Sequence, residues 1–309
     1  MAIAPTTAFT LGDLAAFDEA HLREVIANVS GAVSPALTGR AFGMCDPQEH
    51  SDLSRLAERI EHALAPDSRA AFARSRQQVT GCDDRDAARH SVVEQLFWEL
   101  VYWKTPADYE RLTSGEQVHL GALDVARVDG AVVLDAGAGA GRITLPLARR
   151  ACKVYAMDAA PPLLHLLESK CAGADLRNVE LIRGLFRRVS LPDDSVDSVI
   201  ACSAFGMQEA RGGERGLDEL QRVTRPGGRI VIVWPEDPAW FVRHGFHYTR
   251  LAGSLTITFP TLEEAYVVAA RFYCHAAIRH LDATNRPEVP FHVLGIKEPR
   301  DLCWLTVRK

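Results

Sequence analysis

The amino-acid sequence predicts an α/β fold, with a doubly wound parallel sheet that follows an N-terminal helical extension. Two observations predict this fold. From about residue 130, five apolar runs of strand length alternate with segments of helical length, as in a sheet covered by helices on both faces. Over residues 10–115, apolar residues recur at helical spacing instead. We therefore expect a mostly helical region over 1–115 and a sheet domain over 116–309.

The five expected strands are near-continuous apolar runs, which is typical of strands buried on both faces of a parallel sheet. Helical segments at 162–173 and 216–224 lie between them. A further helix is expected over 261–281, followed by two last strands within 288–309 that a turn at 297–300 joins. The five runs are 131–136, 153–158, 179–184, 196–203 and 229–235.

The composition is that of an ordinary globular protein. Of 309 residues, 47% are hydrophobic and 24% are charged, and the formal net charge is −5. This negative balance gives no general electrostatic reason to expect nucleic acid or an acidic lipid surface as a partner. The amino terminus lacks a signal-peptide pattern, and no apolar run reaches the length of a membrane-spanning helix. We therefore expect a cytoplasmic protein without a membrane segment.

The cysteines predict neither a disulfide framework nor a metal site. The seven cysteines are scattered and include no C-x-x-C pair, so we expect reduced thiols and no bound metal. Cys45 and Cys82 could still meet in space, and the sequence assigns them no role.

The stretch that carries chemistry is "AVVLDAGAGAGRITLPLA", residues 131–148. An apolar run ends at an acid and leads into Gly137, Gly139 and Gly141, which precede a helical segment. Glycines at such a junction let the backbone turn sharply and let a ligand approach the amide groups. A dinucleotide site requires G-x-G-x-x-G, and here the third glycine comes one position too early. The spacing therefore excludes the dinucleotide motif.

Four motifs in order resemble those of class I S-adenosylmethionine-dependent methyltransferases. The first is the glycine stretch, and the second is Asp158, which closes the second apolar run 21 residues after Gly137. The third and fourth are "LPDDSVDSVIACSAF" and "LDELQRVTRPGGRIVIV". The resemblance covers roughly residues 115–309. It implies a Rossmann-like, seven-stranded methyltransferase sheet with S-adenosyl-L-methionine as the cofactor.

The resemblance also implies which residues bind the cofactor. Asp135 would fix the glycine loop and orient the cofactor's amino group, while Gly137 and Gly139 would allow a close approach. Asp158 would bind the ribose hydroxyls. The alternative for Asp135 is a turn acid without ligand contact, and the alternative for Asp158 is an acid that only caps the next helix.

The remaining cofactor contacts are expected beside these residues and at the ends of later strands. Many relatives carry an acid after the third strand, and this acid accepts a hydrogen bond from the adenine amine. Leu185 stands at that position here, so backbone amides and apolar contact would hold the adenine. Cys202 is interpreted as a small strand-end residue near the cofactor. The other expected contacts are Ala136, Ala159 and Phe186.

The acceptor site is expected outside the sheet. Methyl transfer from a sulfonium needs positioning, exclusion of water and, for some acceptors, a base. The last part of the extension, 98–120, would cover the cofactor as a lid. Tyr109 and His119 are its catalytic candidates, and Tyr102 and Glu116 are candidates for binding the substrate. The alternatives are core packing for the aromatic residues and a surface position for the histidine.

A second candidate for the acceptor side is the segment 234–253, which follows the fifth apolar run. The resemblance implies a lid over the acceptor here, because many small-molecule methyltransferases have one at this place. His244 and His247 are its candidates for contact with the substrate. The alternative is an amphipathic cover helix whose histidines face solvent.

The sequence thus predicts methyl transfer to an oxygen, nitrogen or carbon atom of a small metabolite. The N/D-P-P-Y motif of enzymes that act on amide or exocyclic amine nitrogens is absent. The P-C pair that supplies a nucleophilic cysteine to pyrimidine methyltransferases is absent as well. Two other functions stay open, namely methylation of a protein or RNA, and a non-catalytic module that binds the cofactor. The sequence also leaves open a homodimer.

Overall fold

The computed structural model describes residues 102, 106–208, 211–273, 275–294 and 296–309. The helices that we expected before residue 102 lie outside the described residues.

The chain divides into two compact units. The sheet unit comprises Thr113–Ile257 and Lys297–Lys309, and the second unit contains the described residues among the first 112 positions together with Thr258–Ile296. Sequence analysis drew a single boundary between residues 115 and 116. The two compact units divide the chain differently, because the internal segment Thr258–Ile296 belongs to the second unit and not to the sheet unit. The described part of the expected helical region contains α7 (Pro106–Gly115), and the boundary between the units falls within this helix.

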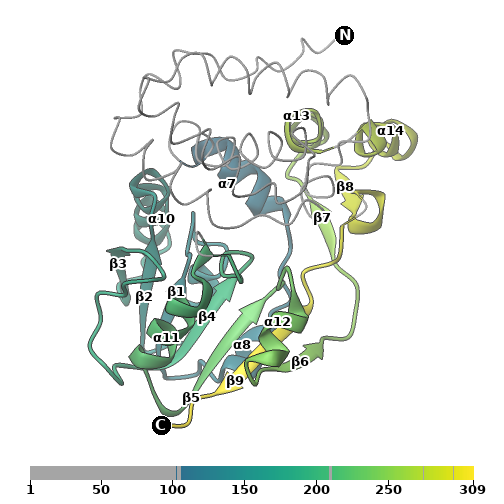
Figure 1. Cartoon of the computed structure of the whole chain (residues 1–309). Helices are drawn as coiled ribbons and strands as arrows, with labels where there is room; N and C mark the ends of the chain where they lie inside the picture. Colours follow the sequence, from purple (N-terminus) through teal and green to yellow (C-terminus); the bar gives the residue numbers. More distant parts are fainter. Residues whose placement is uncertain (1–101, 103–105, 209–210, 274, 295) are drawn as a thin grey trace, which may run out of the picture. The chain divides into compact units, whose positions relative to one another are not determined.

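The sheet unit is built on seven strands in the order β3-β2-β1-β4-β5-β9-β6 (Figure 1). The strands are β1 (Val132–Ala136), β2 (Lys153–Asp158), β3 (Val179–Arg183), β4 (Val196–Cys202), β5 (Thr224–Val233), β6 (His247–Arg250) and β9 (Asp301–Thr306). The first five run parallel, and β9 lies antiparallel between β5 and β6. The order reverses at β1, which pairs with both β2 and β4. The predicted doubly wound sheet is therefore confirmed.

Helices cover both faces of this sheet (Figure 1). They are α8 (Gly121–Ala126), α9 (Thr144–Ala148), α10 (Pro161–Gly173), α11 (Gly213–Val223) and α12 (Pro238–Arg243). On one face, Leu134 and Met157 share a buried cluster with residues of α11 and α12. On the opposite face, Val133 and Val154 share a buried cluster with residues of α8 and α9. Successive side chains of a strand point to opposite faces of the sheet, which explains why Val133 and Leu134 pack against helices on opposite faces.

The sixth strand of the sheet comes from a different segment than expected. β6 lies within 234–253, which sequence analysis interpreted as a lid or cover helix. The strand expected from residue 288 onwards is instead β8 (Glu288–Pro290), which pairs with β7 (Thr256–Thr258) and leads into a short 3-10 helix, η2 (Phe291–Leu294). β6 is short and mostly exposed. Its hydrogen bonds to β9 make it a strand, and no hydrophobic pattern marks it in the sequence.

The helix expected over 261–281 is two helices, α13 (Leu262–Phe272) and α14 (His275–Thr284). Thr261 caps α13, and its hydroxyl accepts a backbone N–H of the first turn at 3.1 Å. Tyr273 follows with an extended backbone (φ −119°, ψ 168°), which ends the helix. The prediction of one continuous helix was wrong because apolar residues recur on both sides of this break.

Candidate functional site

The glycine loop after β1 adopts backbone conformations that side chains disfavour. Gly137, Gly139 and Gly141 have φ values of 82°, 53° and 94°. A Cβ atom on Gly137 would lie 2.4 Å from the Cβ of Ala204, and one on Gly141 would lie 2.5 Å from Cδ1 of Leu167. Glycine is therefore required here by backbone geometry and packing, whatever ligand the loop binds.

Asp158, at the end of β2, joins two loops at the carboxyl edge of the sheet. One carboxylate oxygen accepts a hydrogen bond from the Gly139 N–H at 2.8 Å, and the other accepts from the Ala160 N–H at 2.9 Å. Ala160 directly precedes the first turn of α10, so Asp158 binds the backbone at the start of this helix. A carboxylate oxygen can accept more than one hydrogen bond, and Asp158 is half-buried. A contact with ribose hydroxyls stays a prediction. The neighbouring Ala159 is exposed.

Asp135 lies in the interior at the end of β1. It is 1% exposed, and the Thr144 hydroxyl donates a hydrogen bond of 2.6 Å to its carboxylate. Burial is the main cause that raises the pKa of Asp135 to about 7; the Asp158 carboxylate acts in the same direction, whereas the Thr144 hydrogen bond and Arg142 oppose the shift. The adjacent Ala136 is fully buried. A cation brought to this place would favour the ionised form of Asp135.

An apolar surface follows at the end of β3. The Gly184 N–H donates to the Asp158 carbonyl at 3.1 Å, so this loop begins beside the end of β2. Leu185 is 39% exposed. The Phe186 ring meets the Phe205 ring edge to face, with the ring centroids 5.2 Å apart. The loops after β1, β2 and β3 therefore present glycine backbone, carboxylate and apolar side chains along one edge.

Sequence analysis missed Arg142, which directly follows the last glycine of the loop. Its guanidinium donates to the Glu116 carboxylate at 2.5 Å and to the Cys202 sulfur at 3.5 Å, and it lies 6.0 Å from the ring centre of Trp234. Glu116, a predicted substrate contact, is thus engaged in an ion pair with little exposure. Cys202 is buried at the end of β4, and burial raises the pKa of its thiol. A charged residue placed directly after the third glycine was the available signal for Arg142.

Both ring nitrogens of His119 contact the backbone. Nδ1 accepts a hydrogen bond from the Gly121 N–H at 3.1 Å, so Nε2 carries the proton and donates it to the Ala252 carbonyl at 2.9 Å. To act as a base, His119 would have to release the Gly121 N–H. Its catalytic role stays a prediction.

Tyr102 and Tyr109 lie in the second unit, where their rings meet edge to face with centroids 5.1 Å apart. Both side chains are half-buried, and this ring contact is a packing contact between them. The roles assigned to them from the sequence stay predictions.

His244 and His247 occupy different elements of the segment 234–253. His244 ends α12, and its ring nitrogens lie 2.8 Å from the Trp240 carbonyl and 2.8 Å from the Glu214 carboxylate. His247 is exposed in β6, with its ring stacked on Trp304 at a centroid distance of 4.4 Å. The contacts with Glu214 and Trp304 join this segment to α11 and β9. Contact of either histidine with a substrate stays a prediction.

The loop after β4 is held by a second arginine that sequence analysis did not single out. Arg211 donates to the Ser203 carbonyl at 2.7 Å and to the Glu236 carboxylate at 2.6 Å. Gln208 also donates to Glu236, at 3.3 Å. This contact set joins the ends of β4 and β5 and forms the other side of the reversal point in the sheet.

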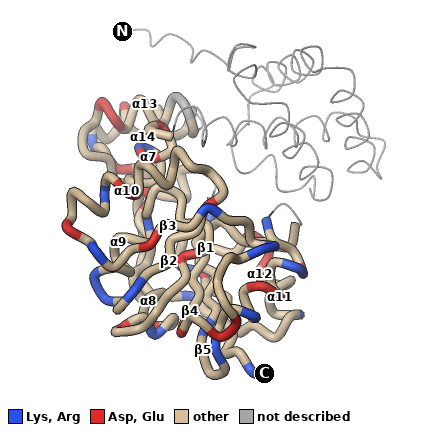
Figure 2. The backbone as a smooth tube through the Cα atoms, turned by 90° about the vertical axis from the view of Figure 1, so that its left-hand side faces the viewer, with Lys and Arg blue, Asp and Glu red and all other residues tan. Residues whose placement is uncertain are grey.

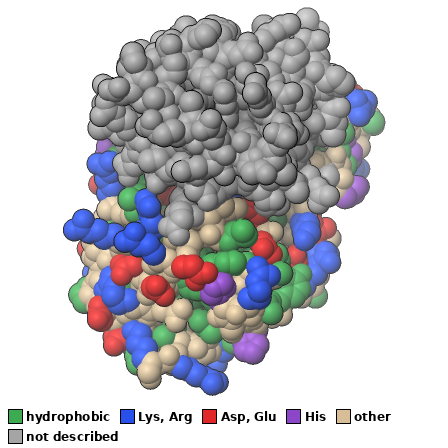
Figure 3. Space-filling model, viewed as in Figure 1, with side chains coloured by type: hydrophobic (Ala, Val, Ile, Leu, Met, Phe, Trp, Pro, Cys, Tyr) green, Lys and Arg blue, Asp and Glu red, His purple; other side chains and the backbone are tan. Residues whose placement is uncertain are grey.

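Charges are mixed over the described residues. Lys and Arg alternate with Asp and Glu along the backbone (Figure 2), and on the face shown in Figure 3 the basic, acidic and hydrophobic side chains are interspersed. Within the described part of the chain, no group of three or more His, Cys, Asp or Glu side chains could hold a metal ion. No described helix has the length and apolarity needed to cross a bilayer.

The known proteins to which part of this chain is similar are methyltransferases. Residues 133–228 match the family model described as a methyltransferase domain. An uncharacterized methyltransferase of Mycobacterium bovis is 36% identical over 102 residues, which is 33% of this chain and 39% of that protein. A demethylmenaquinone methyltransferase of Clavibacter sepedonicus is 37% identical over 123 residues, which is 40% of this chain and 49% of that protein. The chain thus spans less than half the length of these curated relatives.

Among solved structures, a SAM dependent methyltransferase from Aquifex aeolicus is 26% identical. The match covers 41% of this chain and 71% of that chain, with a TM-score of 0.35.

Proposed function

We propose that this chain, which carries a class I methyltransferase domain, transfers a methyl group from S-adenosylmethionine to a small-molecule acceptor. The observation that carries the proposal is the edge formed after β1, β2 and β3. There the Asp158 carboxylate binds the backbone of the positive-φ glycine loop, at the point where the strand order reverses. Open α/β sheets bind their ligands at this point.

The residues at this edge fit a cofactor that combines a cationic amino acid with a nucleoside. Asp135 is buried with a raised pKa, so a cationic amino group would recover the cost of ionising it. Asp158 would bind ribose hydroxyls with its remaining acceptor capacity. The apolar surface of Leu185 and Phe186 would hold adenine. Gly137, which has no side chain in this tightly packed loop, would let the cofactor come close to the loop backbone.

When bound, S-adenosylmethionine supplies a methyl group that is already activated on a sulfonium. The chain therefore has to bind, orient and exclude water, and its carboxylates provide fixed negative charge beside a cationic ligand. Where an acceptor must lose a proton, His119 and Tyr109 are our candidates for the base. His119 would accept that proton at Nδ1 after it releases the Gly121 N–H.

Three observations support a small-molecule acceptor. Two of the relatives found are demethylmenaquinone methyltransferases, from Clavibacter sepedonicus and Thermobifida fusca. The net charge is −5, and basic side chains are interspersed with acidic ones on the face shown in Figure 3. Because binding of nucleic acid depends on basic surface that neutralises phosphates, this charge distribution favours a small molecule over nucleic acid as the acceptor.

The proposal is tested with S-adenosylmethionine labelled in its methyl group. The purified chain is incubated with three substrate pools, namely small molecules that include a demethylmenaquinone analogue, total RNA, and a protein extract. We expect label in the small-molecule fraction only. Label in RNA or protein would support the macromolecular alternative, and binding without label in any pool would support a non-catalytic module.

A further inference from the structure

The crossover from β3 to β4, residues 184–195, contains no helix. Parallel strands are usually joined by a helix, which satisfies its own backbone hydrogen bonds. The backbone N–H and carbonyl groups of an irregular crossover need hydrogen-bond partners from other parts of the protein. Leu185 and Phe186, the apolar surface of the candidate cofactor site, stand at the start of this crossover.

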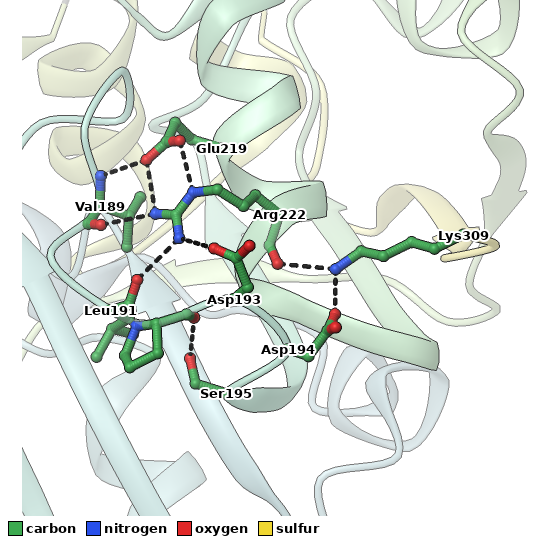
Figure 4. Close-up of polar contacts among 9 residues, drawn as sticks. Val189, Leu191, Asp193, Asp194, Ser195, Glu219, Arg222 and Lys309 are labelled. Atoms are coloured by element: carbon green, nitrogen blue, oxygen red, sulfur yellow. Dashed lines mark hydrogen bonds and ion pairs between the residues drawn. The ribbon is translucent and has the colours of Figure 1, made fainter.

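Arg222 of α11 supplies these partners (Figure 4). One amino group donates to the Leu191 carbonyl at 3.0 Å and the Asp193 carboxylate at 2.7 Å, and the other donates to the Val189 carbonyl at 2.9 Å. The remaining two N–H groups bind Glu219 at 2.7 and 2.9 Å. All five donors of the guanidinium are therefore used, and three of them hold the crossover.

Glu219 completes the attachment from the same helix. It accepts the Val189 N–H at 2.9 Å while it binds Arg222 in a bidentate pair. Val189 is 3% exposed, which keeps its backbone away from water. Its N–H binds Glu219 and its carbonyl binds Arg222, so both backbone groups have a partner on α11. Losing such partners leaves buried polar groups unpaired, which is costly.

The attachment reaches the glycine loop through Phe186. The Cζ atom of Phe186 would lie 3.2 Å from a Cβ on Gly137, and its Cβ would lie 3.3 Å from a Cβ on Gly216. Gly216 lies in α11, two turns before Arg222. α11 therefore leaves room for Phe186 at Gly216, and two other side chains of α11 bind the residues that follow Phe186.

We propose that Arg222, supported by Glu219, is a positioning residue for the cofactor. It holds the crossover so that Phe186 stays against the glycine loop and Leu185 forms the apolar wall of the site. This inference rests on the proposed function, because it names the cofactor as the ligand of that wall. No contact between Arg222 and the ligand is required.

The test compares Arg222→Met with Arg225→Met. Arg225 lies three residues further on, is exposed, and pairs with Asp197 outside the crossover. Calorimetry measures the Kd for S-adenosylhomocysteine, and hydrogen exchange measures protection of the Val189 amide. In Arg222→Met we expect faster exchange and a roughly tenfold higher Kd, as if the competent loop fell to about a tenth of the population. In Arg225→Met both should stay unchanged.

A loss of stability alone should not raise the Kd. Val231→Ala, a truncation in the fully buried centre of β5, is the control for that effect, and its Kd should match that of the unsubstituted protein. If Arg222→Met does not fold, Arg222→Lys is measured in the same way. It keeps the charge but loses the planar fork, so exchange and Kd should both rise by less.

Faster exchange at Val189 with an unchanged Kd would overturn the proposal, and so would unchanged exchange in whichever of the two Arg222 variants is measured. Failure of the unsubstituted protein to bind S-adenosylhomocysteine would contradict the proposed function and the positioning role together. The exchange measurements would still decide in that case whether Arg222 holds the crossover.

Discussion

The glycine edge, residues 135–142, lies at the reversal point of the sheet, whereas the segment 234–253 supplies the edge strand β6, and the two regions are specified differently. At the glycine edge, positive φ values and short Cβ distances make particular residues necessary at particular positions. In the segment 234–253, α12 is capped locally by Asp237, but β6 exists through its pairing with β9. A backbone conformation that only glycine adopts leaves a recognisable spacing of glycines in the sequence, whereas hydrogen bonding to a distant strand leaves no such pattern.

The first prediction tests whether the glycine edge is specified locally. Gly137→Ala combines left-handed strain with an overlap at Ala204, and should lower the free energy of unfolding by about 3 kcal/mol. Gly227→Ala is the matched control, since Gly227 has φ +80° and nothing within 4 Å of its Cβ position. Strain alone should cost it about 1 kcal/mol. Urea unfolding measures both, and equal losses would show that packing against Ala204 adds nothing.

The second prediction concerns the buried acid of this edge. The folded protein holds the proton of Asp135 up to about pH 7, whereas the ordinary pKa is 3.8. The stability that this proton contributes is complete below the ordinary pKa and is lost as the pH rises through 7. Between about pH 5 and pH 8, Asp135→Asn should therefore gain about 2–3 kcal/mol relative to the unsubstituted protein. Urea unfolding at both pH values checks this, and a difference independent of pH would contradict the burial of a titrating carboxyl.

The third prediction concerns the carboxylate that joins the loops. Asp158→Ala removes the acceptor for the Gly139 and Ala160 N–H groups, and should lower the free energy of unfolding by about 2 kcal/mol. Affinity for S-adenosylhomocysteine should fall as well. Asp218→Ala, on the exposed surface of α11, is the control and should change neither property. Unchanged affinity in a folded Asp158→Ala protein would remove Asp158 from the site.

The smallest effect is expected where the segment 234–253 meets α8. His119→Ala loses the bonds to the Gly121 N–H and the Ala252 carbonyl, which should cost about 1 kcal/mol. His119→Asn can still accept the Gly121 N–H, as asparagine does in turns, and should cost less. Thermal unfolding measures the difference. Full turnover by His119→Asn would also remove His119 from the candidate bases.

The parallel strands, their helices and the cofactor edge could be predicted from the sequence. Apolar runs mark buried strands, and the spacing of Gly137 and Gly139 marks a loop that only glycine can form. The place of Arg142 directly after the last glycine was a signal, but its partner Glu116 could not be predicted from that place. Arg222 could not be assigned at all, because its role depends on a partner far along the chain, Val189. The same reason explains why β6 was assigned to a lid.

The central claim is that the edge at Asp135, Gly137 and Asp158 binds S-adenosylmethionine. A calorimetric titration of the purified chain with S-adenosylhomocysteine, and a second one with NAD, tests it most directly. We expect S-adenosylhomocysteine to bind at micromolar concentration and NAD to give no binding heat, because the glycine spacing does not suit a dinucleotide. Binding of NAD without any response to S-adenosylhomocysteine would contradict the account.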